Sequence, residues 1–209
     1  MRSLSIHDKS FHKVSEPGAT RLIRTACKAF AAGGDENSDV HGSFSTYTRD
    51  FLKEHKLRSV PLERFRGNRF NVLFSSAASV HFLAEEMKGF LQISAENRLL
   101  QAVKADLNTE EYLAGCKALG CISELITIPL WAQIERTDTT IIDIGVVYRE
   151  VVKYLENLDT HDFMKGKALL SFVDQDKLRS SIYMKNLLME STYDEKSRSY
   201  SQNYHPRFV

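Results

Sequence analysis

The sequence predicts an all-α protein, an irregular bundle of about seven to nine helices. Three observations predict this fold. Apolar residues recur at spacings of three and four along most of the chain, strict apolar–polar alternation is almost absent, and capping residues precede several periodic segments. The 209 residues are 43% hydrophobic and 26% charged, the composition of a globular chain that can bury one sizeable core.

The individual helices follow from the spacing, the caps and the breaks. Pro17 suits a first helical turn, and Gly33 and Gly34 end the helix that follows it. Residues 33–42 are polar and read as an exposed loop, and Pro61 makes residues 56–67 a connector. The predicted helices cover residues 17–30, 43–55, 68–91, 94–106, 110–128, 144–158, 162–170 and 175–189. Their expected N-caps are Ser43 or Ser45, Asn68, Ser94, and Asn108 or Thr109.

The helix predicted over residues 110–128 is expected to be central, because apolar residues recur along it at spacings of three and four. The most apolar stretch of the chain is residues 121–134. Pro129 removes a backbone donor, so residues 130–134 are either a kinked continuation or a fresh helix. Trp131, the only tryptophan, is expected to be buried because the proline turns the chain into the core. The β-branched run 139–144 can begin as extended chain.

One helical domain is expected over residues 16–190, between a flexible N-terminus at 1–15 and a disordered tail at 191–209. The first residues lack the apolar stretch of a signal peptide, and no window holds 18 uninterrupted apolar residues. We therefore expect an intracellular protein, nuclear or cytoplasmic, without a membrane partner.

No complete catalytic constellation is present in the sequence. Gly33 and Gly34 lack the context of a nucleotide-binding loop, and the histidines and the three cysteines lack the spacing of a zinc site. His81 lies on an apolar helix face and is expected to be a hydrogen-bonded core residue. We expect no enzymatic activity, cofactor or metal, and we expect Cys27, Cys116 and Cys121 to be buried thiols.

Several acids near the end of the chain leave an alternative open. Asp159, Asp162, Asp174 and Asp176 offer oxygen ligands for magnesium, and His161 with Asp162 offers a proton-transfer pair. The other interpretation makes these residues helix caps and solvated loop charges.

A basic segment, residues 53–71, is the most informative stretch. The net charge of the chain is only +1, yet this segment holds six cations against Glu54 and Glu63. The six are Lys53, Lys56, Arg58, Arg64, Arg66 and Arg69. Arginines between Phe65 and Phe70 can bind a phosphate backbone, so these residues are the candidate nucleic-acid site and DNA the candidate partner.

Two other interpretations of the basic segment stay open. Its arginines can instead pair with acids such as Glu85, Glu86 or Asp106 while the two phenylalanines fill the core. The chain would then be a protein-interaction scaffold that uses a helix face or the region of Leu130 and Trp131.

Residues 64–74 (RFRGNRFNVLF) and 117–131 (KALGCISELITIPLW) resemble uncharacterised animal proteins related to mobile elements, distant kin of hAT-type transposases. In such transposases a large all-helical insertion interrupts an RNase H-like catalytic domain, and a motif similar to residues 67–71 lies just before it. The resemblance implies that residues 68–158 belong to such an insertion.

The departures from this family exclude its catalytic residues. Strands with two catalytic aspartates should precede residue 67, yet residues 1–60 show helical patterns. A catalytic glutamate and a hydrophobic dimerisation segment should follow the insertion, yet the sequence ends in a polar stretch. We therefore expect a fragment, truncated product or repurposed derivative that associates with DNA and does not transfer strands.

Overall fold

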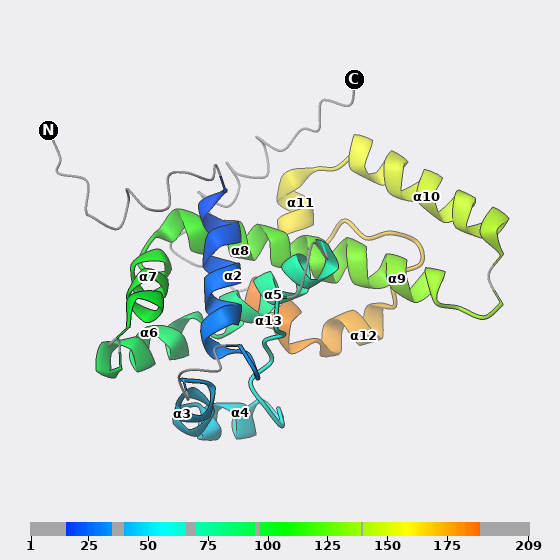
Figure 1. The fold of residues 1–209 in the computed structure, drawn as a ribbon. Coiled ribbons are helices and arrows are strands. Elements are labelled where there is room, and N and C mark those ends of the chain that lie inside the picture. The colour runs from blue at the N-terminus through cyan, green and yellow to red at the C-terminus, as the bar shows by residue number, and fades with distance from the viewer. Residues whose placement is uncertain (1–15, 35–39, 66–69, 95–96, 139, 189–209) are drawn as a thin grey trace, which may run out of the picture.

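A computed structural model of the chain describes residues 16–34, 40–65, 70–94, 97–138 and 140–188 (Figure 1). Within these ranges all regular structure is helical, which confirms the all-α prediction. The expected N-terminal flexible segment, the C-terminal tail and the Asn68 cap lie outside the described residues. The helices are α2 (Gly18–Phe30), α3 (Val40–Tyr47), α4 (Arg49–Glu54), α5 (Phe70–Phe82), α6 (Ala84–Ile93), α7 (Arg98–Leu107), α8 (Glu110–Ile122), the π-helical segment η1 (Ser123–Thr127), α9 (Ile128–Ile134), α10 (Ile141–Glu156), α11 (Thr160–Met164), α12 (Gln175–Ser180) and α13 (Ile182–Leu188).

A continuous helical run, Glu110–Ile134, passes through the molecule as α8, η1 and α9 (Figure 1). Helices α2 and α5 pack against α8, as expected for the central helix. Gly120 allows the close approach of α5, because a Cβ atom there would lie 3.0 Å from the Cα atom of Ala78. Within the described residues this run is long and apolar enough to cross a membrane, and 67% of its apolar window is buried inside the protein, as in the central helix of a helical core.

Pro129 explains the π-helical segment. It has no N–H to donate to Leu125, and its ring would clash with that carbonyl in a regular α-helix. The wider turn of η1 relieves this clash without ending the helix, and the Thr127 hydroxyl bonds to the Ser123 carbonyl at 3.1 Å. Of the two alternatives for residues 130–134, the continuous helix is the one observed.

Three predicted helices are each split in two. The helices 43–55, 68–91 and 175–189 are interrupted at Thr48, Leu83 and Ser181. The Thr48 hydroxyl donates to the Phe44 carbonyl at 2.8 Å, a bond typical of a helix bend, and the Ser181 hydroxyl accepts from Met184 N at 3.2 Å at the start of α13. The expected caps Ser43 and Ser45 are wrong, since both lie inside α3.

Local capping chemistry also corrects three other boundaries. Asn97, not Ser94, caps α7 by accepting a bond from Leu100 N at 2.9 Å. A capping box between Thr140 and Asp143 starts α10 at Ile141, so of the run left open as extended chain Thr140 is extended and residues 141–144 are helical. Helix α11 ends well before residue 170 because Gly166, at φ 63°, closes it with a left-handed turn.

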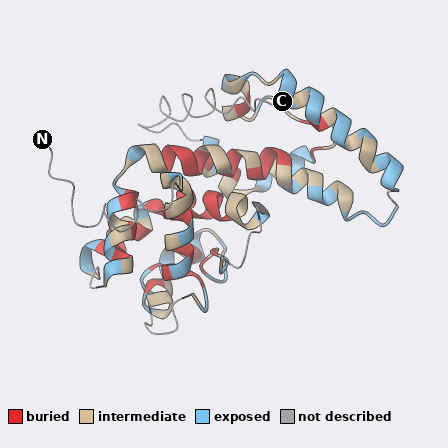
Figure 2. Cartoon of the chain, turned by 45° about the horizontal axis from the view of Figure 1, so that its top comes forward, coloured by how far each residue is buried: buried red, intermediate tan, exposed pale blue. Residues whose placement is uncertain are grey.

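The core consists of two adjoining clusters of buried side chains. The larger joins α2 with α3 and with α5 to α8, and in it the rings of Phe30 and Phe44 lie 4.5 Å apart. The smaller lies where α5, α8 and η1 meet α13, α11 and one residue of α10. Figure 2 shows the buried residues concentrated along α8 and the helices around it, while α10 is mostly exposed.

Trp131 contradicts its predicted burial, since it is 42% exposed. Helix α9 extends beyond the core towards α10 instead of turning inwards (Figure 1). The π-helical segment carries the proline without the change of direction on which the prediction depended.

Candidate functional site

A basic pocket lies where α3 meets α4 and the turn that follows. It is an open cavity of about 420 Å³ lined by eight residues, four of them cationic. The lining residues are Ser45, Thr46, Arg49, Leu52, Lys53, Lys56, Leu57 and Arg58. The structure therefore brings together three of the predicted site residues, Lys53, Lys56 and Arg58.

Local structure explains how these cations converge. Arg49 and Lys53 are four residues apart on α4 and so lie on the same face of that helix. Lys56 has φ 57°, and Leu57 N bonds to the Leu52 carbonyl at 2.8 Å, which closes α4 with a left-handed turn. This turn brings Lys56 and Arg58 back to the pocket.

Within the part of the chain that the structure describes, the basic pocket has no negative partner. No Asp or Glu among the described residues lines it, and none of its four cations forms an ion pair with a described residue. Asp50 and Glu54 are exposed on α4 but are not part of the pocket wall. Four positive charges therefore face solvent around one concavity, an arrangement that attracts an anion with several phosphate groups.

The other predicted site residues lie elsewhere. Arg64 is exposed but does not line the pocket, and its guanidinium lies beside Gly33. Arg66 and Arg69 lie outside the described residues, so the structure does not test them.

Two acids considered as partners for these arginines are paired with other cations. Asp106 accepts bonds from both Nε and Nη2 of Arg21, with the Nε distance at 3.0 Å, and Glu85 pairs with Lys88 at 2.7 Å. Phe65 is half-buried and lies under the guanidinium of Arg24, 5.7 Å from ring centre to Cζ. The interpretation in which the phenylalanines of the basic segment fill the core is thus supported for Phe65. The pairing of its arginines with Asp106 or Glu85 is wrong.

Sequence reasoning missed Arg49, which stands just before the basic segment as it was defined. The signal was present in the spacing, because residues 49, 53 and 56 follow one another at intervals of four and three. Arg49 is not part of the apolar face that predicts the helix 43–55.

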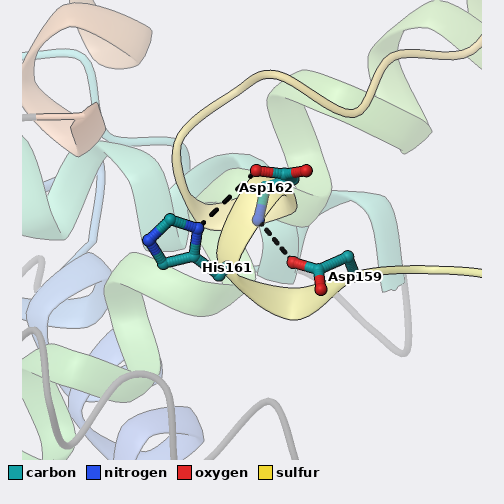
Figure 3. Close-up of side chains that lie close together, drawn as sticks. All are labelled: Asp159, His161 and Asp162. Carbon is teal, nitrogen blue, oxygen red and sulfur yellow. Dashed lines mark hydrogen bonds and ion pairs between the residues drawn. The ribbon is translucent and has the colours of Figure 1, made fainter.

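The acids near the end of the chain behave mainly as helix caps. Asp159 accepts a bond from Asp162 N at 2.8 Å at the start of α11, and Asp174 caps α12. Figure 3 shows Asp159, His161 and Asp162 together, and their ligand atoms lie within 4.8 Å of one another. His161 Nδ1 is 3.6 Å from an Asp162 oxygen, and both side chains are about half exposed. The cap interpretation is confirmed for Asp159 and Asp174.

The core histidine and cysteine predictions are confirmed. His81 is buried on α5, and its Nδ1 lies 2.6 Å from the Asn186 side-chain oxygen. Cys27, Cys116 and Cys121 are buried free thiols. Burial raises the pKa of Cys27 to about 11 and raises that of Cys116 as well, so neither is a thiolate nucleophile near neutral pH.

Glu124 is a second residue that sequence reasoning missed. It lies in η1 with 8% of its surface exposed, and Ser181 Oγ donates to its Oε2 at 2.7 Å. Burial raises the pKa of this carboxyl, and the bond from Ser181 opposes that effect. A single acid inside the apolar stretch was the available signal.

Comparison with known proteins gives no relative: no protein-family model, curated protein or solved structure matches the chain.

Proposed function

We propose that this chain is a non-catalytic helical module that binds nucleic acid through the basic pocket. The observation that supports it is the convergence of Arg49, Lys53, Lys56 and Arg58 on one concavity whose described wall contains no acid. Lysine and arginine contacts to phosphates supply sequence-independent affinity, so we propose binding to the backbone rather than to particular bases.

We further propose that the module derives from the helical insertion of a hAT-type transposase. The all-helical fold of the described residues after residue 68 agrees with such an insertion, and the residues of the basic pocket precede the arginine-plus-aromatic motif at 67–71 in the sequence. In this proposal the chain keeps DNA association and lacks strand transfer, since it carries no complete catalytic constellation.

A fluorescence anisotropy titration with labelled duplexes of unrelated sequence tests the proposal. Affinity should fall steeply between about 50 and 200 mM salt, as the release of counterions from phosphates requires. The variant with Arg49→Gln, Lys53→Gln, Lys56→Gln and Arg58→Gln should bind more weakly, with a salt slope smaller by roughly one unit for each lost contact.

A matched control distinguishes binding at the pocket from a general effect of positive charge on DNA affinity. Arg149, Lys153, Lys177 and Arg179 are exposed outside the pocket, and their replacement by glutamine removes the same charge. An equal loss of DNA affinity in both variants, or an affinity that does not depend on salt, would contradict the proposal. A further variant, Arg64→Ala with Arg66→Ala, measures what the arginines outside the described pocket add.

A second candidate function is a protein-interaction scaffold, favoured by the outer face of α10. Ile141, Tyr148, Val152 and Leu155 follow the four-and-three spacing of a two-helix seam and are 41–86% exposed. Arg149 and Glu156 flank this stripe and have no ion pair with a described residue, so an antiparallel second copy would bring opposite charges together. Sedimentation velocity tests this: self-association that Val152→Lys abolishes would support it, and a monomer at all concentrations would exclude it.

A further inference from the structure

Two hydroxyl groups line the basic pocket beside its four cations. They belong to Ser45 and Thr46 in the last turn of α3, just before the bend at Thr48 that leads into α4. Helices α3 and α4 lie together at one end of the molecule, away from α10 (Figure 1). The function proposed above uses the cations of this pocket and gives these hydroxyl groups no role.

Thr46 carries the more accessible of the two hydroxyl groups. Thr46 is exposed, whereas Ser45 is half-buried, and the Thr46 hydroxyl forms no hydrogen bond with a described residue. Its neighbour Thr48 shows the usual alternative, because that hydroxyl is buried and donates to the Phe44 carbonyl at 2.8 Å. The Thr46 hydroxyl is therefore available for covalent modification.

The cations around Thr46 form a site for a dianion. Arg49 follows Thr46 by three residues and Lys53 follows it by seven, and all three line the same cavity. None of the four cations of the pocket pairs with a described residue, so their positive charges repel one another across the cavity. A phosphate fixed on Thr46 would relieve this repulsion and accept charge-assisted hydrogen bonds from the nearest cations.

Helix α3 is also suited to present Thr46 to a modifying enzyme. The helix has only eight residues, and of these it buries Phe44 alone. A helix of this length is marginal without packing, and segments with few buried contacts open locally at a low cost in free energy. Thr46 can therefore reach the active site of an enzyme while the rest of the core stays folded.

From these observations we infer that Thr46 is a phosphorylation site and that its phosphate occupies the basic pocket and displaces nucleic acid. A protein kinase transfers the γ-phosphoryl group of a nucleoside triphosphate to Thr46. The bond from the γ-phosphorus to the bridging oxygen breaks, a bond to Thr46 Oγ1 forms, the nucleoside diphosphate leaves, and the hydroxyl proton passes to solvent. The phosphate carries about −1.5 to −2 charges at pH 7, so it offsets roughly half of the positive charge of the pocket.

The displacement of nucleic acid rests on the function proposed above, whereas occupation of the pocket by the phosphate does not. Phosphorylation of the full chain tests first whether an enzyme reaches Thr46. The chain is incubated with ATP, magnesium and a kinase that selects basic residues after its acceptor, and mass spectrometry of proteolytic fragments locates the phosphate. We expect modification of Thr46 in the folded chain. A chain that gains this phosphate only after thermal unfolding, or not at all, would overturn the inference.

Phosphorus NMR tests occupation of the pocket without any nucleic acid. The full chain is prepared with phosphothreonine in place of Thr46 or, as the matched control, in place of Thr137, which is exposed outside the pocket. Nearby cations favour the dianion, so the second pKa of the phosphate should be lower at Thr46 than at Thr137. The four glutamine substitutions in the pocket should abolish this difference. Equal pKa values at the two positions, or a difference that survives these substitutions, would overturn the inference.

Fluorescence anisotropy with the labelled duplexes tests the displacement of nucleic acid. Phosphothreonine in place of Thr46 should weaken DNA binding by about tenfold or more at about 100 mM salt and reduce the salt slope by roughly two units, as the loss of about two phosphate contacts requires. Phosphothreonine in place of Thr137 adds the same charge and should change DNA affinity much less.

Equal weakening of DNA binding by the two phosphates, or full DNA affinity with phosphate on Thr46, would overturn the displacement of nucleic acid. If the unmodified chain shows no salt-dependent DNA binding, the function proposed above fails. The NMR titration still decides in that case whether the phosphate on Thr46 occupies the pocket.

Discussion

Helices α2 and α10 both have apolar residues at helical spacing, but the protein covers the apolar face of α2 and leaves much of that of α10 open. Helix α2 buries Leu22, Ile23, Ala26, Cys27, Ala29 and Phe30 among its 13 residues. Helix α10 is longer, at 16 residues, and buries Val151 alone. Amphipathic spacing therefore identifies a helix and a potential buried face, and it does not tell whether another element covers that face.

The two helices are also attached by different forces. Helix α2 is held by the close-packed larger core and by the bond of Arg21 to buried Asp106. Helix α10 is tied to the chain after α11 largely by polar bonds: Tyr154 donates to the Ala168 carbonyl at 2.8 Å, and Glu150 accepts from Ser171 N at 2.7 Å. We expect stability to depend strongly on α2 and weakly on the outer face of α10.

The largest effect is expected from Arg21→Met. This change leaves the Asp106 carboxylate buried without its cation, which should lower the free energy of unfolding by about 3–5 kcal/mol. Arg24→Met is the control, since Arg24 pairs with Glu16 in an exposed position where a salt bridge contributes about 0–1 kcal/mol. Urea denaturation measures both, and equal losses would show that the buried pair does not anchor α2.

Next in size is the contrast between two side-chain truncations. Leu22→Ala in α2 should lower the free energy of unfolding by about 2–5 kcal/mol, because the Leu22 side chain is fully buried. Val152→Ala in α10 should change stability by less than about 0.5 kcal/mol, because Val152 is 52% exposed. Thermal unfolding of both variants checks this. A large loss at Val152 would mean that the outer face of α10 is covered in solution.

A smaller, pH-dependent effect is expected from Glu124→Gln. The carboxyl has a raised pKa in the folded protein, so the unfolded chain loses this proton first as pH rises above the ordinary value of 4.5. Folding stability linked to Glu124 is complete below that pH and decreases as pH rises through the folded pKa. The melting temperature of Glu124→Gln relative to the unchanged protein should therefore increase from about pH 4 to about pH 8. A constant difference would contradict a buried, ionising Glu124.

The smallest effect concerns Trp131 at the junction between the two regions. Because its side chain is 42% exposed, its fluorescence should be accessible to iodide quenching in the folded protein. Trp131→Phe should change stability by less than about 0.5 kcal/mol, as expected for a surface substitution. Emission typical of a fully buried indole, protected from iodide, would place Trp131 in a covered interface.

Local signals in the sequence were sufficient for the fold class and insufficient for the boundaries. The spacing of α8 and α2 predicted both helices because each has a continuous apolar face. The interruptions at Thr48, Leu83 and Ser181 were missed because apolar spacing continues across them. A one-residue bend changes the direction of a helix without changing its pattern, so tertiary packing decides it.

By itself, the sequence determined that the chain is helical, that residues 110–128 are central, and that cations gather after residue 53. These properties depend on residues that are near one another along the chain. Residue type and spacing are therefore enough to predict them. Only the tertiary structure decided that Arg49 joins Lys53, Lys56 and Arg58, that Arg64 stays apart, and that Glu124 bonds to Ser181. Such contacts depend on how distant helices pack, and packing is set by the shapes and volumes of the whole core rather than by any local pattern.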